Sequence, residues 1–247
     1  MEEHLSERTT GLAPSLIREI SEQAYSIDGI IPLWFGEGCW PTSEIAINAV
    51  SKALKSGDHF YQPNSGKIEL REEISQYYSK VYNLEIPVSN LTVTASGMNG
   101  LAIVAQALVS SGDQVVSIQP SWPNIAETFR ICGANVSVIS LEVENKKWTL
   151  NLERLLSAIT HETKAVLINS PNNPTGWTMS AEDQLRLLNH CRQTSTWIVA
   201  DDVYSRLYYQ GEYAPNFLKI AEKSDLLISV NSFSKAWSMT GWRLGWI

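Results

Sequence analysis

The sequence predicts an α/β domain with three layers, in which helices cover both faces of a mostly parallel seven-stranded sheet. From residue 90 onward, short runs rich in valine and isoleucine alternate with longer segments of helical periodicity. Strands separated by helices pair in parallel through right-handed crossovers. Small and polar residues follow these runs, at the strand ends where α/β folds place their ligands.

The alternation defines seven predicted strands and the helices between them. The strands lie at 91–94, 114–118, 135–139, 165–168, 197–200, 226–230 and 243–247, and the helices at 100–109, 124–132, 152–159 and 181–194. The region before residue 90 is mainly helical, with a short strand. Helices are predicted at 14–24, from a cap at Thr42 or Ser43 to Leu54, and at 67–82, and the strand at 29–35.

Composition indicates a folded protein that acts on small molecules. The chain has 247 residues, 44% of them apolar and 18% charged. Its net charge of -7, without a cluster of lysine or arginine, argues against a nucleic-acid or anionic-membrane partner. Three widely spaced cysteines indicate neither disulfides nor a zinc site, and no other metal site is expected. The acidic N-terminus is unlike a signal peptide and the longest apolar segment, 100–109, is too short for a membrane span, so we expect a cytoplasmic protein.

Lys235 is the first candidate for chemistry. The apolar run 226–230 ends just before Ser232 and Ser234, so the lysine lies at the end of a predicted strand. An amine condenses with an aldehyde when burial or a neighbouring cation lowers its pKa. Arg243 is such a cation, and its guanidinium fork matches phosphate oxygens. A single lysine or arginine is usually a surface charge, but this combination predicts a receptor for a phosphorylated aldehyde.

Three further loops at strand ends carry candidate side chains. Gly97, Met98 and Asn99 open a helix, whose N-terminal amides suit a phosphate. Trp122, held between prolines, could stack on a planar ring. Asp201 ends an apolar strand, where a carboxylate is costly unless it meets a cation.

The chain resembles the class I and II aminotransferases, which are pyridoxal-phosphate enzymes of fold type I. Two motifs carry the resemblance: Ser-x-Ser-Lys at 232–235 followed by Gly-x-Arg-x-Gly at 241–245, and Asn-Pro-Thr-Gly at 173–176. The resemblance implies that pyridoxal 5'-phosphate forms a Schiff base with Lys235 and that Asp201 pairs with its pyridine nitrogen. It also implies that Asn173 and Tyr204 bind the phenolic oxygen and that the last strand of the sheet is antiparallel.

The resemblance assigns the remaining site residues. It implies that Gly97, Met98, Asn99, Ser232, Ser234 and Arg243 bind the phosphate, and that Trp122 stacks on the ring. Gly36, with Trp122 and Asn173, would contact the substrate, whose carboxylate the Gly36 backbone approaches; the alternative for Gly36 is a simple turn. Tyr61 would reach the cofactor of the second subunit in a homodimer. The alternative for Tyr61 is a half-buried loop aromatic.

The function implied is transfer of an amino group between an amino acid and a 2-oxo acid, with the freed Lys235 amine moving the substrate proton. Alternatives are a carbon–sulfur lyase, a synthase or a decarboxylase of the same fold, or a non-catalytic remnant that binds the cofactor. Family chains continue beyond the last sheet strand. We therefore expect an N-terminal arm with part of a small domain at 1–45, the large domain at 46–247, and no C-terminal part of the small domain.

Overall fold

The computed structural model describes residues 6–12 and 15–247, and it confirms the predicted fold class. The central sheet has the strand order β1-β9-β8-β7-β6-β2-β3. Five neighbouring strands, from β8 to β3, run parallel, whereas β9 is antiparallel to both of its neighbours. The strands span Val93–Thr94 (β1), Gln114–Gln119 (β2), Asn135–Ser140 (β3), Thr163–Asn169 (β6), Trp197–Asp201 (β7), Leu227–Ser232 (β8) and Gly245–Trp246 (β9).

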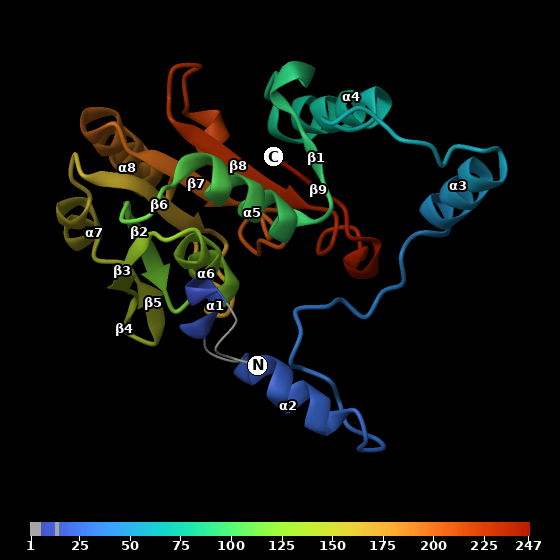
Figure 1. Cartoon of the computed structure of the whole chain (residues 1–247), viewed down its shortest axis with the longest axis horizontal. Coiled ribbons are helices and arrows are strands. Elements are labelled where there is room, and N and C mark those ends of the chain that lie inside the picture. Colours follow the sequence, from blue (N-terminus) through green and yellow to red (C-terminus); the bar gives the residue numbers. More distant parts are fainter. Residues whose placement is uncertain (1–5, 13–14) are drawn as a thin grey trace.

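Alternation of side chains along the parallel strands builds a core on each face of the sheet. In β2, β6 and β7, the residues Val116, Val166 and Ile198 pack against α7 (Leu152–Ala158) and α8 (Ala181–Thr194). Their neighbours in sequence point the other way, toward α5 (Gly97–Leu108) and α6 (Pro123–Ile131). These strands are apolar on both faces because helices cover both faces (Figure 1).

The helix ends follow local capping. Ser96 accepts a hydrogen bond from the Asn99 N–H at 3.1 Å, so α5 begins at Gly97 rather than at the predicted Gly100. Ser180 caps α8 in the same way. The remaining α-helices are α1 (Glu7–Thr10), α2 (Leu16–Ala24), α3 (Glu44–Lys55) and α4 (Ile68–Tyr77), which continues as a π-helix, Tyr78–Tyr82. Short 3-10 helices span Val88–Asn90, Phe217–Lys219 and Thr240–Trp242. Residue 14, predicted as the first of α2, lies outside the described residues.

Two predictions about strands need correction. The strand predicted at 29–35 is irregular backbone, because Ile31 and Leu33 are 77% and 86% exposed and Pro32 has no N–H to donate to a ladder. A hairpin that was not predicted joins β4 (Glu142–Glu144) to β5 (Lys147–Thr149). Its turn residues Asn145 and Lys146 both have positive φ, as a two-residue hairpin turn requires.

Two of the N-terminal helices, α2 and α3, lie away from the core. Figure 1 shows α2 and α3 at a distance from the sheet, and α3 has no buried residue. The predicted domain division at residue 45 stays a prediction. Among the described residues, no helix combines the length and apolar character that crossing a bilayer requires.

Gly245 lets β9 approach α5 closely. A Cβ at this position would lie 2.6 Å from the Gly97 nitrogen and 2.7 Å from the Asn231 oxygen, both backbone atoms that cannot rotate away. We therefore expect Gly245→Ala to lower the free energy of unfolding by about 3 kcal/mol. Gly241→Ala is the matched control, because a Cβ there meets nothing within 4 Å, and we expect a change within about 0.5 kcal/mol. Urea unfolding of both variants measures the difference; equal stabilities would contradict the close approach.

Candidate active site

Lys235 follows β8 and lies under the N-terminal loop. Its amine donates a hydrogen bond to the Gly36 carbonyl at 2.6 Å, and it lies 5.9 Å from the centre of the Tyr204 ring. Burial lowers the pKa of the Lys235 amine, the negative charge of Glu37 raises it, and the positive charge of Arg243 lowers it. The net effect is a lowered pKa, which favours the neutral, nucleophilic amine.

An aromatic cluster holds the loop that carries Lys235. Phe233 and Trp237 flank the lysine in sequence and both pack against Trp246 of β9, with ring centres 4.8 and 6.0 Å away. Trp237 also packs on Tyr77 of α4 at 5.3 Å. Rings on both sides of the lysine therefore fix the loop through the core beneath it.

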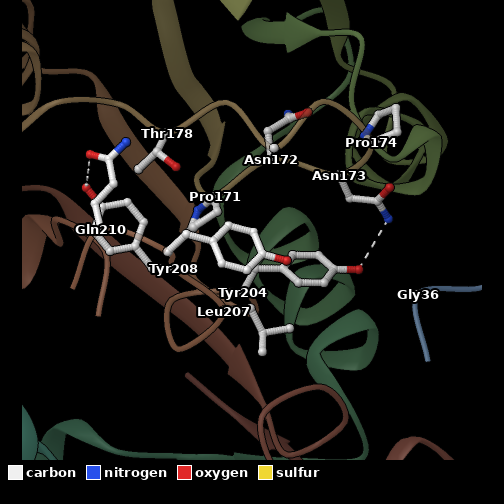
Figure 2. A pocket seen from close by; sticks show the side chains of 12 residues that line it. Gly36, Pro171, Asn172, Asn173, Pro174, Thr178, Tyr204, Leu207, Tyr208 and Gln210 are labelled. Atoms are coloured by element: carbon white, nitrogen blue, oxygen red, sulfur yellow. Dashed lines mark hydrogen bonds between the residues drawn. The ribbon is translucent and has the colours of Figure 1, made fainter. Parts of the chain in front are cut away.

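The loop after β6 presents Asn173 to Tyr204. The Asn173 side-chain amide donates a hydrogen bond to the Tyr204 hydroxyl at 3.3 Å (Figure 2). Asn169, the last residue of β6, accepts from the Asn173 N–H at 2.9 Å and donates to the Asp201 carbonyl at 3.2 Å. Sequence reasoning missed Asn169, although a polar residue that ends an apolar strand was a usable signal. Asn169 thus couples the Asn173 loop to the end of β7.

Asp201 is buried at the end of β7, with 5% of its surface exposed. Burial raises the pKa of its carboxyl group to about 7, while the Val203 N–H, which donates at 3.3 Å, lowers it. None of the salt bridges formed by the described residues includes Asp201. Its charge also raises the pKa of the Tyr204 phenol, after the larger effect of burial. Asp201 is thus a buried acid that a cationic ligand would stabilise.

Asp202, the next residue, is buried in a separate polar network. Its carboxylate accepts hydrogen bonds from Ser229 and from the Asn216 amide, the latter at 3.3 Å. Burial raises the pKa of this carboxyl group as well, to about 7. The two neighbouring acids therefore differ in surroundings: Asp202 has two side-chain donors, whereas Asp201 has one backbone donor among the described residues.

The N-terminus of α5 lies beside the serines of the lysine loop. A Cβ on Gly97 would lie 3.3 Å from the Ser232 Cβ, so only glycine leaves this space open. Ser232 and Ser234 are buried and their hydroxyl oxygens are 2.9 Å apart. Ser96 accepts from the Asn99 N–H, which leaves the N–H groups of Gly97 and Met98 without an acceptor among the described residues.

The remaining predicted site residues, Arg243, Trp122 and Tyr61, are less closely associated with Lys235 and Tyr204. Arg243 is exposed, and its guanidinium donates to the Thr240 carbonyl at 2.7 Å. Trp122 precedes α6 and is partly buried against the core on that face. Tyr61 is fully exposed, so the alternative of a half-buried loop aromatic is wrong. Its predicted contact with a second subunit stays a prediction.

A cavity of about 330 Å³ opens next to the Asn173–Tyr204 pair. Gly36, Asn173 and Tyr204 are among its lining residues, together with prolines, further tyrosines and Gln210 (Figure 2). Gly36 also accepts the hydrogen bond from the Lys235 amine. Within the described part of the chain, no group of three or more histidine, cysteine or acidic residues could hold a metal ion.

Comparison with known proteins identifies the family. The family described as aminotransferase class I and II matches residues 30–247. The chain belongs to the class I and II aminotransferases. It is 33% identical over 243 residues to the aspartate aminotransferase of Pyrococcus horikoshii, covering 98% of this chain and 61% of that protein. The relative from Geobacillus stearothermophilus is also 33% identical, with 98% and 63% covered.

Solved structures of relatives share the fold of this aminotransferase-family chain. A crystal structure of aspartate aminotransferase from Thermotoga maritima superposes with a TM-score of 0.90 at 31% identity, covering 98% of this chain and 65% of that one. Thermus thermophilus aspartate aminotransferase with maleate superposes with a TM-score of 0.89 at 30% identity, with 98% and 63% covered. The chain thus spans about three fifths of the length of the relatives it matches.

Members of the family use pyridoxal 5'-phosphate, and the residues of this chain fit that group in three respects. Asp201 is a buried acid without a cation among the described residues, which suits a pyridine N–H. Lys235 is a partly buried amine with a lowered pKa, which suits reaction with an aldehyde. Gly97, at the N-terminus of α5, leaves an open space beside Ser232 where two N–H groups suit a phosphate.

Burial of Asp201 has a consequence for stability in the absence of cofactor. Its pKa rises from 3.8 to about 7, so between these pH values the unfolded chain releases a proton that the folded chain keeps. Stability therefore falls as pH rises from about 4 to about 7. We expect Asp201→Asn to raise the free energy of unfolding at pH 7.5 by on the order of 1–2 kcal/mol and to flatten its pH dependence.

Urea unfolding of the cofactor-free protein at several pH values tests this expectation. Asp28→Asn, a change at an exposed acid, is the matched control and should leave the pH dependence unaltered. Asp202 should maintain part of the slope in the Asp201→Asn variant, because burial raises its pKa in the same direction. A loss of stability at pH 7.5 on replacing Asp201 would show that its carboxylate is already paired.

Proposed function

We propose that this chain carries the cofactor site of an aminotransferase, which moves an amino group between an amino acid and a 2-oxo acid. The observation that carries the proposal is the arrangement around Tyr204. This phenol accepts a hydrogen bond from Asn173, and the Asp201 charge raises its pKa. The centre of its ring lies 5.9 Å from the Lys235 amine. Asn173 and Lys235 thus lie near this phenol, and Asp201 acts on its pKa, which supports one site built from three strand ends.

The bound cofactor would supply an electron sink for the bonds at the substrate α-carbon. Asp201 would hold a proton on the pyridine nitrogen, since a buried carboxylate is stabilised by a cation and stabilises it in return. Asn173 and Tyr204 would hold the phenolic oxygen through an amide N–H and a hydroxyl. Their mutual hydrogen bond, with Asn169 behind it, orients both groups before a ligand arrives.

Lys235 would act twice. Its neutral amine, favoured by burial and by Arg243, would first bind the aldehyde. When a substrate amine takes its place, the released amine would remove the proton from the substrate α-carbon and return a proton at the cofactor carbon. A lowered pKa suits this role, because a base that is protonated at neutral pH cannot accept a proton.

The phosphate would lie between α5 and the lysine loop. The Gly97 and Met98 N–H groups, the Ser232 and Ser234 hydroxyls and the Arg243 guanidinium are the proposed donors. Trp122 is the proposed stacking partner. Asn99 offers this site less than expected, because its N–H and its side-chain oxygen already cap α5.

The substrates and the assembly are also proposals. The compared relatives are named aspartate aminotransferases, which makes aspartate the first amino donor to test. The Gly36 carbonyl accepts a hydrogen bond from the Lys235 amine, which supports a contact between the Gly36 backbone and a substrate there. Tyr61, exposed on its loop, would complete the site of a second subunit in a homodimer.

Covalent capture tests the central residue. We expect added pyridoxal 5'-phosphate to give a visible absorbance band that borohydride reduces, with the label on the peptide containing Lys235. Lys235→Ala should abolish specific labelling, whereas Lys223→Ala, at an exposed lysine, should retain it. Equal labelling of the Lys235→Ala protein would contradict the assignment.

Amino transfer itself is tested on protein that retains Lys235 and has bound pyridoxal phosphate. We expect aspartate to convert bound pyridoxal phosphate to pyridoxamine phosphate, with one oxaloacetate formed per site. Asn173→Ala should slow this conversion about 10-fold or more, because one of two groups on the phenolic oxygen is lost. Release of ammonia or carbon dioxide without pyridoxamine phosphate would support a lyase or decarboxylase instead.

A further inference from the structure

A short N-terminal segment, residues 36–42, lies across the loop that carries Lys235. We call it the strap. Three contacts join them: the Lys235 amine donates to the Gly36 carbonyl at 2.6 Å, the Thr240 hydroxyl donates to the Glu37 carboxylate at 2.8 Å, and the Thr42 hydroxyl donates to the Ser238 carbonyl. The partners are about 200 residues apart in sequence, so the contacts are tertiary. The strap is therefore fixed to the reactive lysine at its first residue.

Space around Gly36 is limited. A Cβ there would lie 3.0 Å from the Tyr204 hydroxyl and 3.5 Å from the Lys235 amine. The backbone of the strap thus passes close to both groups. Any displacement of Gly36 would remove the acceptor of the Lys235 amine and open the space beside Tyr204.

Charged and titratable groups face the Lys235 amine from three elements. Glu37 approaches from the strap, Arg243 from the turn after the lysine loop, and the Tyr204 ring from the loop after β7. Glu37 is exposed, so water and salt screen its charge. Its hydrogen bond to Thr240 holds that charge in a defined place beside the lysine loop.

We propose that Glu37 is a positioning residue for Lys235, acting through its hydrogen bond to Thr240 to keep the Gly36 carbonyl on the amine. This hydrogen bond joins the strap to the lysine loop close to the reactive amine, because Glu37 is next to Gly36 and Thr240 is five residues after Lys235. In the cofactor-free protein the strap holds the amine by one hydrogen bond. The amine must leave Gly36 before it can react with an aldehyde.

The electrostatic effect of Glu37 supports this role. Its carboxylate raises the pKa of the Lys235 amine and so opposes burial and Arg243. Glu37 therefore favours the protonated amine, which donates a stronger hydrogen bond to the Gly36 carbonyl than the neutral amine does and does not attack aldehydes. Loss of the Glu37 charge alone would therefore favour the neutral, nucleophilic amine.

The inference concerns how the lysine of the proposed function is held, but its test uses the cofactor-free protein. Reductive methylation with formaldehyde and borohydride, followed by peptide mass spectrometry, gives the labelling of Lys235 as a function of pH. Exposed Lys223 is the internal reference. The midpoint of the profile reports the amine pKa, whereas the plateau reports access, so the two effects are separable.

Glu37→Gln keeps the side-chain oxygen but removes the charge. We expect it to lower the Lys235 midpoint by about 0.5 unit at low salt, which is about three-fold more neutral amine at a given pH, and to have less effect in 1 M salt. Glu44→Gln removes an exposed charge a few residues away and should leave the midpoint unchanged. Equal midpoints for the Glu37→Gln and Glu44→Gln proteins would overturn the proposal.

Thr240→Val removes the donor and keeps the shape. We expect faster hydrogen exchange at residues 36–38 and a higher labelling plateau for Lys235, without loss of global stability. Unchanged exchange would overturn the role of the Glu37–Thr240 bond. If these results hold and pyridoxal phosphate still fails to label Lys235, the inference about the strap stands and the proposed function fails.

Discussion

The site depends on one buried carboxyl group. Asp201 ends β7 in the middle of a parallel sheet that is covered on both faces, and its carboxyl group has one backbone donor and no cation among the described residues. Burial raises its pKa to about 7. Folding therefore leaves an unfavourable feature at this point, which a ligand with a protonated ring nitrogen would relieve. A position that costs stability in the free protein is the feature most readily explained by ligand binding.

Burial affects Asp201 and Lys235 in opposite directions. It raises the pKa of the acid and lowers that of the amine, so in each case the neutral form is favoured. Both groups act on Tyr204: the Asp201 charge raises the pKa of its phenol, and the Lys235 amine lies 5.9 Å from the centre of its ring. The hydrogen bond from Asn173 couples Tyr204 to the loop after β6. In the free site, burial therefore works against charge on both groups.

Sequence periodicity was enough to predict the three layers and the positions of most helices and strands. The strands are continuously apolar because helices cover both faces of the sheet. Periodicity failed at 29–35, where an apolar run has no neighbouring strand among the described residues, and at 142–149, where turn geometry rather than hydrophobicity makes the hairpin. The motifs predicted Lys235, Asn173 and Tyr204 for one site, and these side chains lie near one another in the structure. The motifs could not reveal Asn169 or the Glu37–Thr240 bond, because such supporting contacts depend on tertiary distances.

The state of the Asp201 carboxyl group tests the account most directly. Carbon-13 NMR of carboxyl-labelled protein, with the Asp201 signal assigned by its loss in Asp201→Asn, gives its titration with and without pyridoxal 5'-phosphate. We predict a midpoint near 7 in the free protein, where burial dominates, and a carboxylate that stays ionised to much lower pH once the cofactor is bound. A midpoint near 3.8 in the free protein, unchanged by cofactor, would contradict the account.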